Sequence, residues 1–237
     1  MNASDFGKTL GAVLDAHFSS RPGVLEAVAA GAAFEQWFAL EARLAIEAAR
    51  PALGLDEKVP YANHEVWRYW TANEYKKVDL YIADSLGGDG EAEEGGNSAS
   101  PCLAAIEFKL IHNNKNWPSK CQQVLTDLYP TRRKPPRPNK TKAKNKKKPK
   151  HTAREKIQLK PALGWFSVPV LIGKTYWDPS IYYPGSGFDS IKEWLGAVDH
   201  RLASATKELW RTPKVRTVEG EYQEPPSHLS FRVLSPR

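Results

Sequence analysis

The stretches VDLYIAD, residues 78–84, and AAIEFKL, residues 104–110, each read as an apolar β-strand that carries charge where a buried strand normally has none. Asp79 lies in the first stretch, and Glu107 and Lys109 lie two residues apart in the second. Because side chains alternate between the two faces of a strand, Glu107 and Lys109 share one face. If the two strands pair, Asp79 comes beside Glu107, and the sheet then brings two carboxylates together.

Two neighbouring carboxylates repel each other and raise each other's pKa unless a cation lies between them. Mg²⁺ and Mn²⁺ are hard divalent ions that one or two carboxylates can hold together with water and a substrate phosphate. Lys109 is placed to stabilise charge on an attacking water or on that phosphate. This combination of residues favours hydrolysis of a phosphodiester bond.

A structural explanation of the same residues is also open. Glu107 and Lys109 could be an exposed pair on an edge strand, and Asp79 could cap a turn. The second strand argues against this explanation, because its other residues are too apolar for an edge: Ala104, Ala105, Ile106 and Phe108.

Hydrophobic periodicity places further helices and strands around these two strands. The pattern predicts helices over 5–18, 24–50, 117–129 and 188–210, and further strands over 64–70, 163–172 and 229–234, the last as a short edge strand. The predicted order is therefore α–α–β–β–β–α–β–α–β. A chain of 237 residues in this order fits a single α/β domain spanning residues 1–237.

The net charge of +7 is unevenly distributed along the chain. Residues 131–150 hold eleven basic residues and no acidic one, whereas residues 84–100 hold five acidic residues and no basic one. Both stretches have too few apolar residues to bury, so we expect flexible insertions over 84–101 and 131–152. The basic insertion suits a polyanion such as nucleic acid, with a solvated tail or a targeting tag as the alternative. Its basic residues are Arg132, Arg133, Lys134, Arg137, Lys140, Lys142, Lys144, Lys146, Lys147, Lys148 and Lys150.

Several classes of protein are disfavoured by composition. The sequence has no run of about 18 apolar residues, so we expect no membrane partner. The start MNASDFGKTL does not resemble a secretory signal. The two cysteines, Cys102 and Cys121, cannot form a disulfide scaffold or a four-cysteine zinc site. The expected location is therefore the reducing cytoplasm.

An aspartate in one apolar strand, E-x-K in the next and a helix–strand unit after them resembles the PD-(D/E)XK nuclease superfamily. Restriction endonucleases and many repair nucleases belong to this superfamily. The resemblance spans roughly residues 34–173 and implies a restriction-endonuclease-like α-β-β-β-α-β core, with a mixed sheet flanked by helices and with terminal helical additions. The sequence departs from the pattern because Val78 replaces the usual proline and 27 residues separate Asp79 from Glu107.

The resemblance also implies roles for individual residues. Asp79 and Glu107 would bind Mg²⁺ or Mn²⁺, and Lys109 would be the catalytic lysine. The superfamily often carries a glutamine near its site on the helix that follows. The further residues implied in this way are the backbone carbonyl of Phe108, as a metal ligand, and Gln122 and Gln123.

Glu41 is a further candidate from the helix predicted over 24–50. On a helical wheel this carboxylate falls in the middle of the apolar arc, where an unpaired charge would be costly. Members of the superfamily often bring a glutamate from the first core helix to the metal, which would make Glu41 an accessory metal ligand or a water-positioning group. The alternative is a buried salt bridge to an arginine such as Arg68.

The sequence thus predicts a metal-dependent nuclease, with DNA endonuclease activity of a restriction or repair type as the leading expectation. The alternative is a catalytically inactive nucleic-acid-binding or scaffold protein on the same fold. The sequence does not separate DNA from RNA, and it leaves open whether the protein forms a homodimer.

Overall fold

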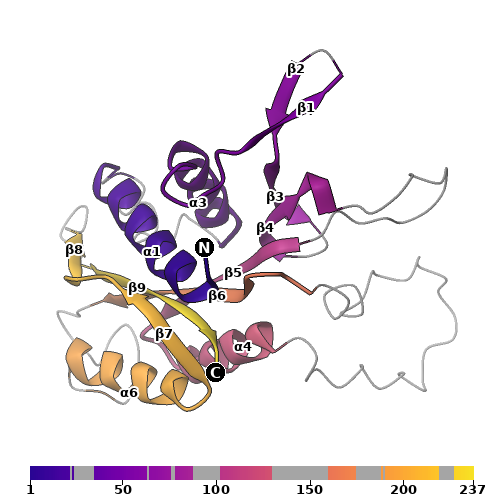
Figure 1. Ribbon diagram of the computed structural model, residues 1–237. Coiled ribbons are helices and arrows are strands. Elements are labelled where there is room, and N and C mark those ends of the chain that lie inside the picture. The colour runs from indigo at the N-terminus through magenta and orange to yellow at the C-terminus, as the bar shows by residue number, and fades with distance from the viewer. Residues whose placement is uncertain are drawn as a thin grey trace, which may run out of the picture.

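A seven-stranded mixed sheet forms the centre of the protein in the computed structural model (Figure 1). The strands lie in the order β3-β4-β5-β6-β9-β7, and β8 pairs with β9 beside that path. The structure describes residues 1–21, 23, 35–62, 64–75, 78–87, 102–129, 160–174, 188, 190–218 and 227–237.

The described helices and strands have the following bounds. The helices are α1 (Ala3–Ser19), α3 (Glu35–Ala48), α4 (Trp117–Leu128) and α6 (Ile191–Ala203), with a short 3-10 turn η1 (Ser85–Gly87). The strands are β1 (Lys58–Tyr61), β2 (His64–Trp67), β3 (Tyr69–Tyr75), β4 (Val78–Asp84), β5 (Cys102–His112), β6 (Gly164–Lys174), β7 (Thr206–Arg211), β8 (Arg216–Val218) and β9 (Ser227–Pro236).

The pairing directions make this a mixed sheet. β4 runs antiparallel to both β3 and β5, β5 runs parallel to β6, and β9 runs antiparallel to β6. A parallel pair needs a long crossover between its strands, and α4 lies in the chain between β5 and β6. The predicted α/β class and the pairing of the strands over 78–84 and 104–110 are therefore confirmed.

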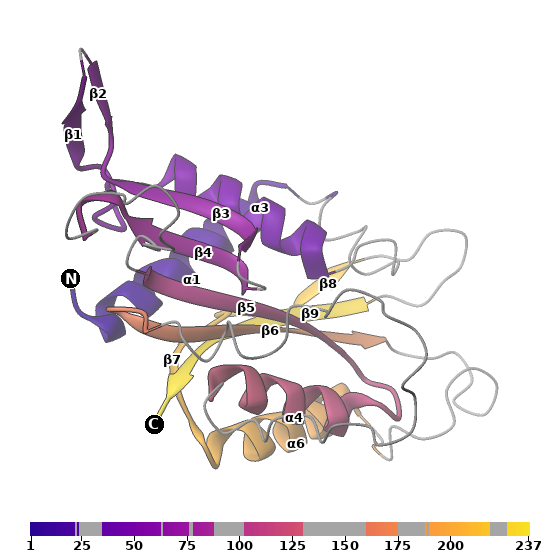
Figure 2. The ribbon, with the colours of Figure 1, turned by 90° about the vertical axis from the view of Figure 1, so that its right-hand side faces the viewer.

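Helices cover both faces of the sheet, with α1 and α3 on one side and α4 and α6 on the other (Figure 2). Side chains alternate between the two faces of β5, so this strand contributes to the core on each side of the sheet. Ile106 and Phe108 belong to the core under α1 and α3, whereas Ala105 and Ile111 belong to the core under α4 and α6. Full burial of such side chains contributes about 1.5–3 kcal/mol for each large apolar residue, so both layers stabilise this strand.

The two cysteines lie in the core under α4 and α6. Cys102 begins β5 and Cys121 lies on α4, and both are free and buried. Burial raises the pKa of the Cys121 thiol to about 11, although the nearby charge of Arg201 acts in the opposite direction.

Two glycines let α1 approach β7 closely. A Cβ atom added to Gly7 would lie 2.2 Å from Cδ1 of Leu209, and one added to Gly11 would lie 2.2 Å from Cγ of Trp210. The Trp210 ring in turn stacks on Phe231 of β9, with the ring centroids 4.9 Å apart. The first helix therefore packs on the edge of the sheet far from β4 and β5.

The C-terminal part of the chain differs from the prediction. The helix predicted over 188–210 ends at Ala203, and its last residues form β7 because Leu209 is buried against the core under α1 and α3. The strand predicted at the edge over 229–234 is longer and lies inside the sheet, between β6 and β7. Among the described residues, the additions after β6 are therefore one helix and three strands, not helices alone.

The N-terminal half also differs in two places. Of the helix predicted over 24–50, the structure describes α3, while residues 24–34 lie outside the described residues. The strand predicted over 64–70 is broken at Arg68, which separates β2 from β3. Arg68 forms ion pairs with Glu57 at 2.8 Å and with Asp84 at 2.7 Å, and these contacts fix the break.

A β-hairpin of β1 and β2 projects from the body of the protein (Figure 2). The strand β1 was not predicted from the sequence. The hairpin is held at its base by Trp67, whose ring lies 4.9 Å from the Arg50 guanidinium and 5.0 Å from the Lys58 ammonium group. Such cation–π contacts contribute about 0.5–1 kcal/mol at exposed positions.

Most of the two predicted insertions cannot be compared with the structure. Residues 88–101 and 130–152 lie outside the described residues, and so do the basic residues of the second insertion. Asp84, at the start of the first, ends β4 and pairs with Arg68. Among the described helices, none is both long enough and apolar enough to cross a bilayer.

Candidate active site

Asp79 lies where β4 and β5 separate. The antiparallel register pairs Leu80 with Ile106, so Asp79 and Glu107 are the next neighbours across the two strands. An oxygen of the Asp79 carboxylate accepts the backbone N–H of Phe108 at 2.8 Å, and Asn73 donates its side-chain amide to the Asp79 carbonyl at 3.0 Å. The register of the two strands therefore puts Asp79 opposite Glu107, one position past the last paired residues.

Glu107 and Lys109 point to the side of the sheet that α4 and α6 cover. Glu107 is buried with 3% of its surface exposed, and β5 lies inside the sheet, between β4 and β6. The alternative of an exposed pair on an edge strand is therefore wrong. A buried glutamate in a central strand needs a compensating partner, since burying a bare charge is costly.

Glu35, at the start of α3, also reaches this place. Its carboxylate lies 2.8 Å from Nζ of Lys109 and 3.4 Å from Nζ of Lys120, and it accepts the backbone N–H of Leu110 at 3.3 Å. The N–H groups of Phe108 and Leu110 lie beyond the last paired residues of β4 and β5. The carboxylates of Asp79 and Glu35 thus accept the backbone N–H groups of Phe108 and Leu110, two residues apart on β5.

The charges around Lys109 act on its pKa and on that of Glu35. Burial is the largest influence on Lys109 and lowers its pKa, but Glu35, Asp127 and Asp79 together raise it above its ordinary value. Burial likewise raises the pKa of Glu35, and Lys109, Lys120 and the Leu110 N–H outweigh it, so the net pKa is lowered. Lys109 and Glu35 are therefore a charged pair at neutral pH. We call Glu35, Asp79, Glu107, Lys109, Lys120 and Asp127 the carboxylate cluster.

Glu41 contacts residues outside the carboxylate cluster. Its carboxylate lies 2.9 Å from Nε2 of His17 and 3.0 Å from Nη1 of Arg21, so it faces α1 and the residues that follow. The predicted burial is confirmed, since 7% of its surface is exposed, but its cation is not Arg68. The residue of α3 that reaches Lys109 is Glu35, which was not among the candidates predicted from the sequence.

The other residues predicted for the site are Gln122, Gln123 and the backbone of Phe108. Gln122 and Gln123 are exposed on α4. The same helix instead supplies Lys120, which contacts Glu35, and Asp127, which acts on the pKa of Lys109. Phe108 donates its backbone N–H to Asp79.

The donor set fits a hard divalent cation with few protein ligands. Asp79 and Glu107 offer neighbouring carboxylate oxygens, the ligand type that Mg²⁺ and Mn²⁺ prefer. The described residues contain no group of three or more His, Cys, Asp or Glu side chains placed to hold a metal ion. A bound Mg²⁺ would therefore depend on water and on substrate phosphate for its other ligands, as is usual for this ion.

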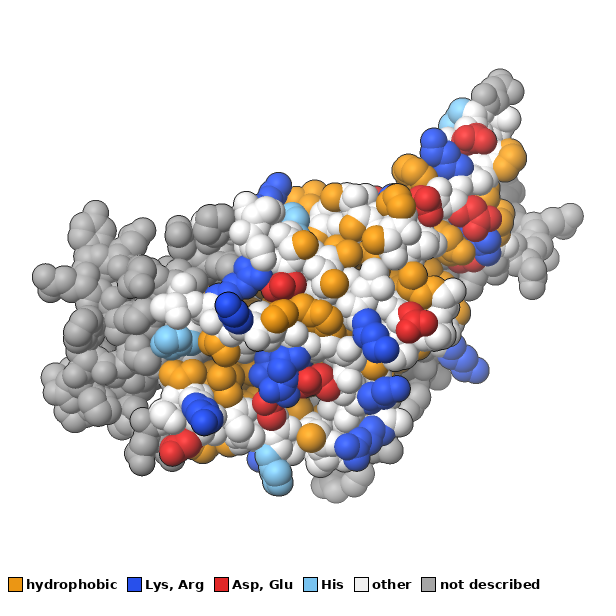
Figure 3. All heavy atoms as spheres, turned by 60° about the vertical axis from the view of Figure 1, so that its left-hand side comes forward, with side chains coloured by type: hydrophobic (Ala, Val, Ile, Leu, Met, Phe, Trp, Pro, Cys, Tyr) orange, Lys and Arg blue, Asp and Glu red, His pale blue; other side chains and the backbone are white. Residues whose placement is uncertain are grey.

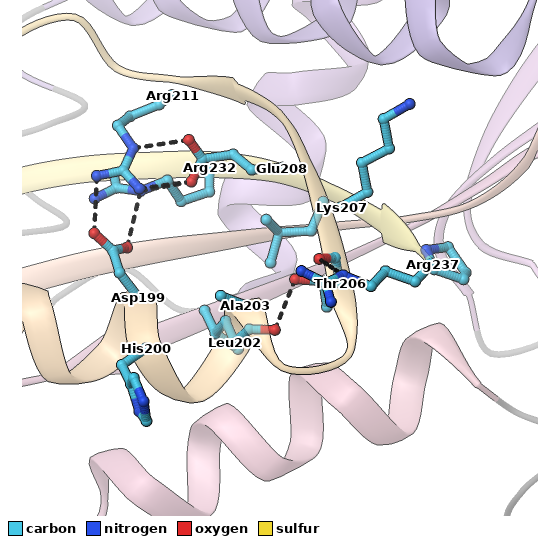
Figure 4. Close-up of a pocket in the computed structure, with 12 residues that line it drawn as sticks. Asp199, His200, Leu202, Ala203, Thr206, Lys207, Glu208, Arg211, Arg232 and Arg237 are labelled. Carbon is cyan, nitrogen blue, oxygen red and sulfur yellow. Dashed lines mark hydrogen bonds and ion pairs between the residues drawn. The ribbon is translucent and has the colours of Figure 1, made fainter.

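A second charged region lies between α6, β7 and β9. Arg211 lies 2.8 Å from the Asp199 carboxylate and 2.7 Å from that of Glu208, and Arg232 lies 3.3 Å from Asp199 and 3.6 Å from Glu208 (Figure 4). We call these four residues the arginine cluster. They line a cavity of about 670 Å³, and Figure 4 shows His200 pointing away from them.

One face of the protein carries no dominant charge. The face shown in Figure 3 mixes basic and acidic side chains with apolar ones. This face therefore resembles the ordinary solvated surface of a globular protein more than the single-sign field that attracts a polyanion.

Similarity to known proteins gives no independent assignment of the carboxylate cluster, so its function has to be argued from its own chemistry. No protein-family model matches the chain, and no curated protein or solved structure matches it.

Proposed function

We propose that this protein is a divalent-metal-dependent nuclease that hydrolyses phosphodiester bonds in nucleic acid, with DNA as the expected substrate. The observation that carries the proposal is that Asp79 and Glu107 are neighbours across β4 and β5, with Lys109 on the same face as Glu107. Apart from the β1–β2 hairpin between α3 and β3, the order is α3-β3-β4-β5-α4-β6, which supports the proposal because the nuclease superfamily that the sequence resembles has the core order α-β-β-β-α-β.

Each residue of the cluster has a role in this proposal. Asp79 and Glu107 would hold Mg²⁺ or Mn²⁺, which when bound neutralises phosphate charge and lowers the pKa of a coordinated water. Lys109 places a positive charge where negative charge develops on the phosphate. Glu35 holds the Lys109 ammonium group at 2.8 Å, so the charge is oriented before the substrate arrives.

The test is cleavage of supercoiled plasmid, linear duplex, single-stranded DNA and RNA in the presence of Mg²⁺, Mn²⁺ or EDTA. Three variants remove one group each: Asp79→Asn, Glu107→Gln and Lys109→Gln. Three matched controls make the same changes at exposed positions: Asp56→Asn, Glu65→Gln and Lys207→Gln. We expect each site variant to lose activity by about 100-fold or more, and each control to cleave like the wild type.

Two outcomes would count against the proposal. Full Mg²⁺-dependent cleavage by Asp79→Asn or Glu107→Gln would overturn the assignment of the site. Tight binding of nucleic acid by the wild type, without cleavage in any metal, would favour a catalytically inactive binding protein on this fold.

A further inference from the structure

A row of polar side chains crosses the neighbouring strands β4, β5 and β6 at the level of Glu107. The antiparallel register places Asp79 opposite Glu107, and the parallel register pairs Glu107 with Ser167. Residues paired across neighbouring strands share one face of a sheet. Trp165 and Leu171, which lie two and four residues from Ser167 on β6, both belong to the core under α4 and α6. Ser167 therefore lies beside Glu107 on the face that these two helices cover.

Apolar side chains border this polar row on two sides. On the far side of Ser167, β9 contributes the buried Leu234. Two residues nearer the start of β5, the same face carries a row of side chains buried in the core under α4 and α6: Tyr81, Ala105 and Trp165. In its own row, the polar side chain that the sheet places beside Ser167 is therefore that of Glu107.

The Ser167 hydroxyl is buried and lacks a hydrogen bond. The residue is 1% exposed, and among the described residues its Oγ atom has no hydrogen-bond partner. Burying a hydroxyl without a partner is costly, and the large majority of buried side-chain polar atoms in proteins are hydrogen-bonded to protein or to ordered water. Packing alone would favour an apolar residue at this position. The serine therefore points to a polar group that its hydroxyl binds.

A water ligand of a divalent cation is a group of this kind. Mg²⁺ usually keeps several water ligands when one or two carboxylates of a protein hold it. The described residues place no third His, Cys, Asp or Glu beside Asp79 and Glu107 to replace those waters. A hydroxyl has one hydrogen to donate and two lone pairs that accept. Oγ of Ser167 can therefore accept a hydrogen bond from a metal-bound water and donate its own hydrogen to the Glu107 carboxylate.

We propose that Ser167 is a positioning residue of the metal site, and that its hydroxyl binds a water ligand of the divalent cation held by Asp79 and Glu107. The inference rests on the metal site of the proposed function, but it does not require cleavage. Residues that orient the ligands of a metal strengthen its binding although they do not touch the ion. Ser167 therefore contributes to the affinity for the cation, and it does so without adding charge.

The first experiment measures Mn²⁺ binding without nucleic acid, from the EPR signal of the free ion during a titration. Ser167→Ala removes the hydroxyl, and Ser227→Ala makes the same change at a buried serine of β9 as the control. Glu107→Gln serves as the reference for a damaged site. We expect Ser167→Ala to raise the Kd for Mn²⁺ by about 10-fold and Ser227→Ala to bind like the wild type. An unchanged Kd in Ser167→Ala would overturn the inference.

The second experiment separates a role at the metal from a role in the fold, by urea denaturation in EDTA. Because the Ser167 hydroxyl has no partner among the described residues, we expect the unfolding midpoint of Ser167→Ala not to fall. Ser167→Cys keeps a side chain of similar size with only a weak donor, and it should bind Mn²⁺ as weakly as Ser167→Ala. If the midpoint falls in the alanine variant alone, the Kd of the cysteine variant decides. A midpoint that falls in both variants would assign the hydroxyl to the fold and overturn the inference.

The outcomes separate this inference from the proposed function. Weaker Mn²⁺ binding by Ser167→Ala, together with a wild type that cleaves no nucleic acid, would leave the role of Ser167 standing and remove the nuclease. Metal-dependent cleavage by the wild type, with equal Mn²⁺ binding by Ser167→Ala, would do the reverse. A wild type that binds Mn²⁺ no more tightly than Glu107→Gln does would overturn both.

Discussion

The carboxylate cluster is built around β4 and β5 and the arginine cluster around β9 and β7 of the same sheet, and the two clusters use charge differently. In the arginine cluster, Arg211 and Arg232 both contact Asp199 and Glu208, so two cations and two anions close a ring. In the carboxylate cluster, Lys109 contacts Glu35, and the charges of Asp127 and Asp79 also raise the pKa of Lys109. Three carboxylates thus act on one ammonium group, and a fourth, that of Glu107, lies on the adjacent position of the same face.

The difference suggests which region serves the fold and which serves chemistry. A closed ring of ion pairs satisfies its own members, and removal of one member leaves a buried charge behind. Neighbouring carboxylates are all negatively charged and repel each other. Natural proteins keep such an arrangement where a cation or a substrate compensates the negative charge. Four predictions test this contrast, and they are ordered by the size of the expected effect.

The largest expected effect is loss of stability on breaking the arginine cluster. Asp199→Ala removes the carboxylate that contacts both guanidinium groups, and the Arg232 side chain is almost fully buried, with 4% exposed. We expect the free energy of unfolding to fall by about 3 kcal/mol, measured by urea denaturation. Cleavage per folded molecule should stay at the wild-type level. A loss of cleavage at full folding would mean that the arginine cluster is part of the site.

The second prediction concerns stabilisation by metal. A ligand that binds only the folded state at ten times its Kd stabilises that state by about 1.4 kcal/mol. We expect Mg²⁺ to raise the unfolding free energy of the wild type and of Asp56→Asn by this amount, and to leave Asp79→Asn and Glu107→Gln unchanged. An equal rise in all four proteins would place any bound Mg²⁺ elsewhere.

The third prediction is pH-dependent and concerns Glu35. The folded protein lowers the pKa of this carboxyl, so its contribution to stability is present above the unfolded pKa and is lost as pH falls through the folded pKa. Glu35→Gln should therefore cost about 1 kcal/mol at neutral pH and almost nothing under strongly acid conditions. Urea denaturation across the acid range would measure this. A cost that is the same at every pH would show that packing, not charge, explains the effect.

The smallest expected effect is that of Glu41→Gln, the same substitution six residues further along α3. A glutamine can still accept hydrogen bonds from His17 and Arg21, so we expect a loss of about 0.5 kcal/mol. The Mg²⁺ concentration for half-maximal cleavage should not change. If more Mg²⁺ were needed, Glu41 would act at the metal despite its contacts with α1.

Local sequence patterns predicted much of the central sheet. The apolar runs of β4, β5 and β6 and the amphipathic α4 each carry their own periodicity, and alternation alone placed Glu107 and Lys109 on one face. Strand pairing then placed Asp79 beside Glu107. These elements are predictable because the residues that define them are neighbours in the sequence.

Other features depend on contacts between distant parts of the chain. Glu35 reaches Lys109 because β4 begins only at Val78 and leaves the edge of β5 uncovered there, which no helical wheel encodes. The strand β7 follows α6 after a short turn, and burial of Leu209 under α1 overrides the helical pattern that continues through it.

The burial of both cysteines has a practical consequence for measuring local opening. The chain has only Cys102 and Cys121, which lie in the core beneath α4 and α6, and the Cys121 thiol has a raised pKa. A thiol reagent added to the native protein can react only when this layer opens, because the reactive species is an exposed thiolate. The rate of alkylation would therefore report how often α4, which also carries Lys120, lifts away from the sheet.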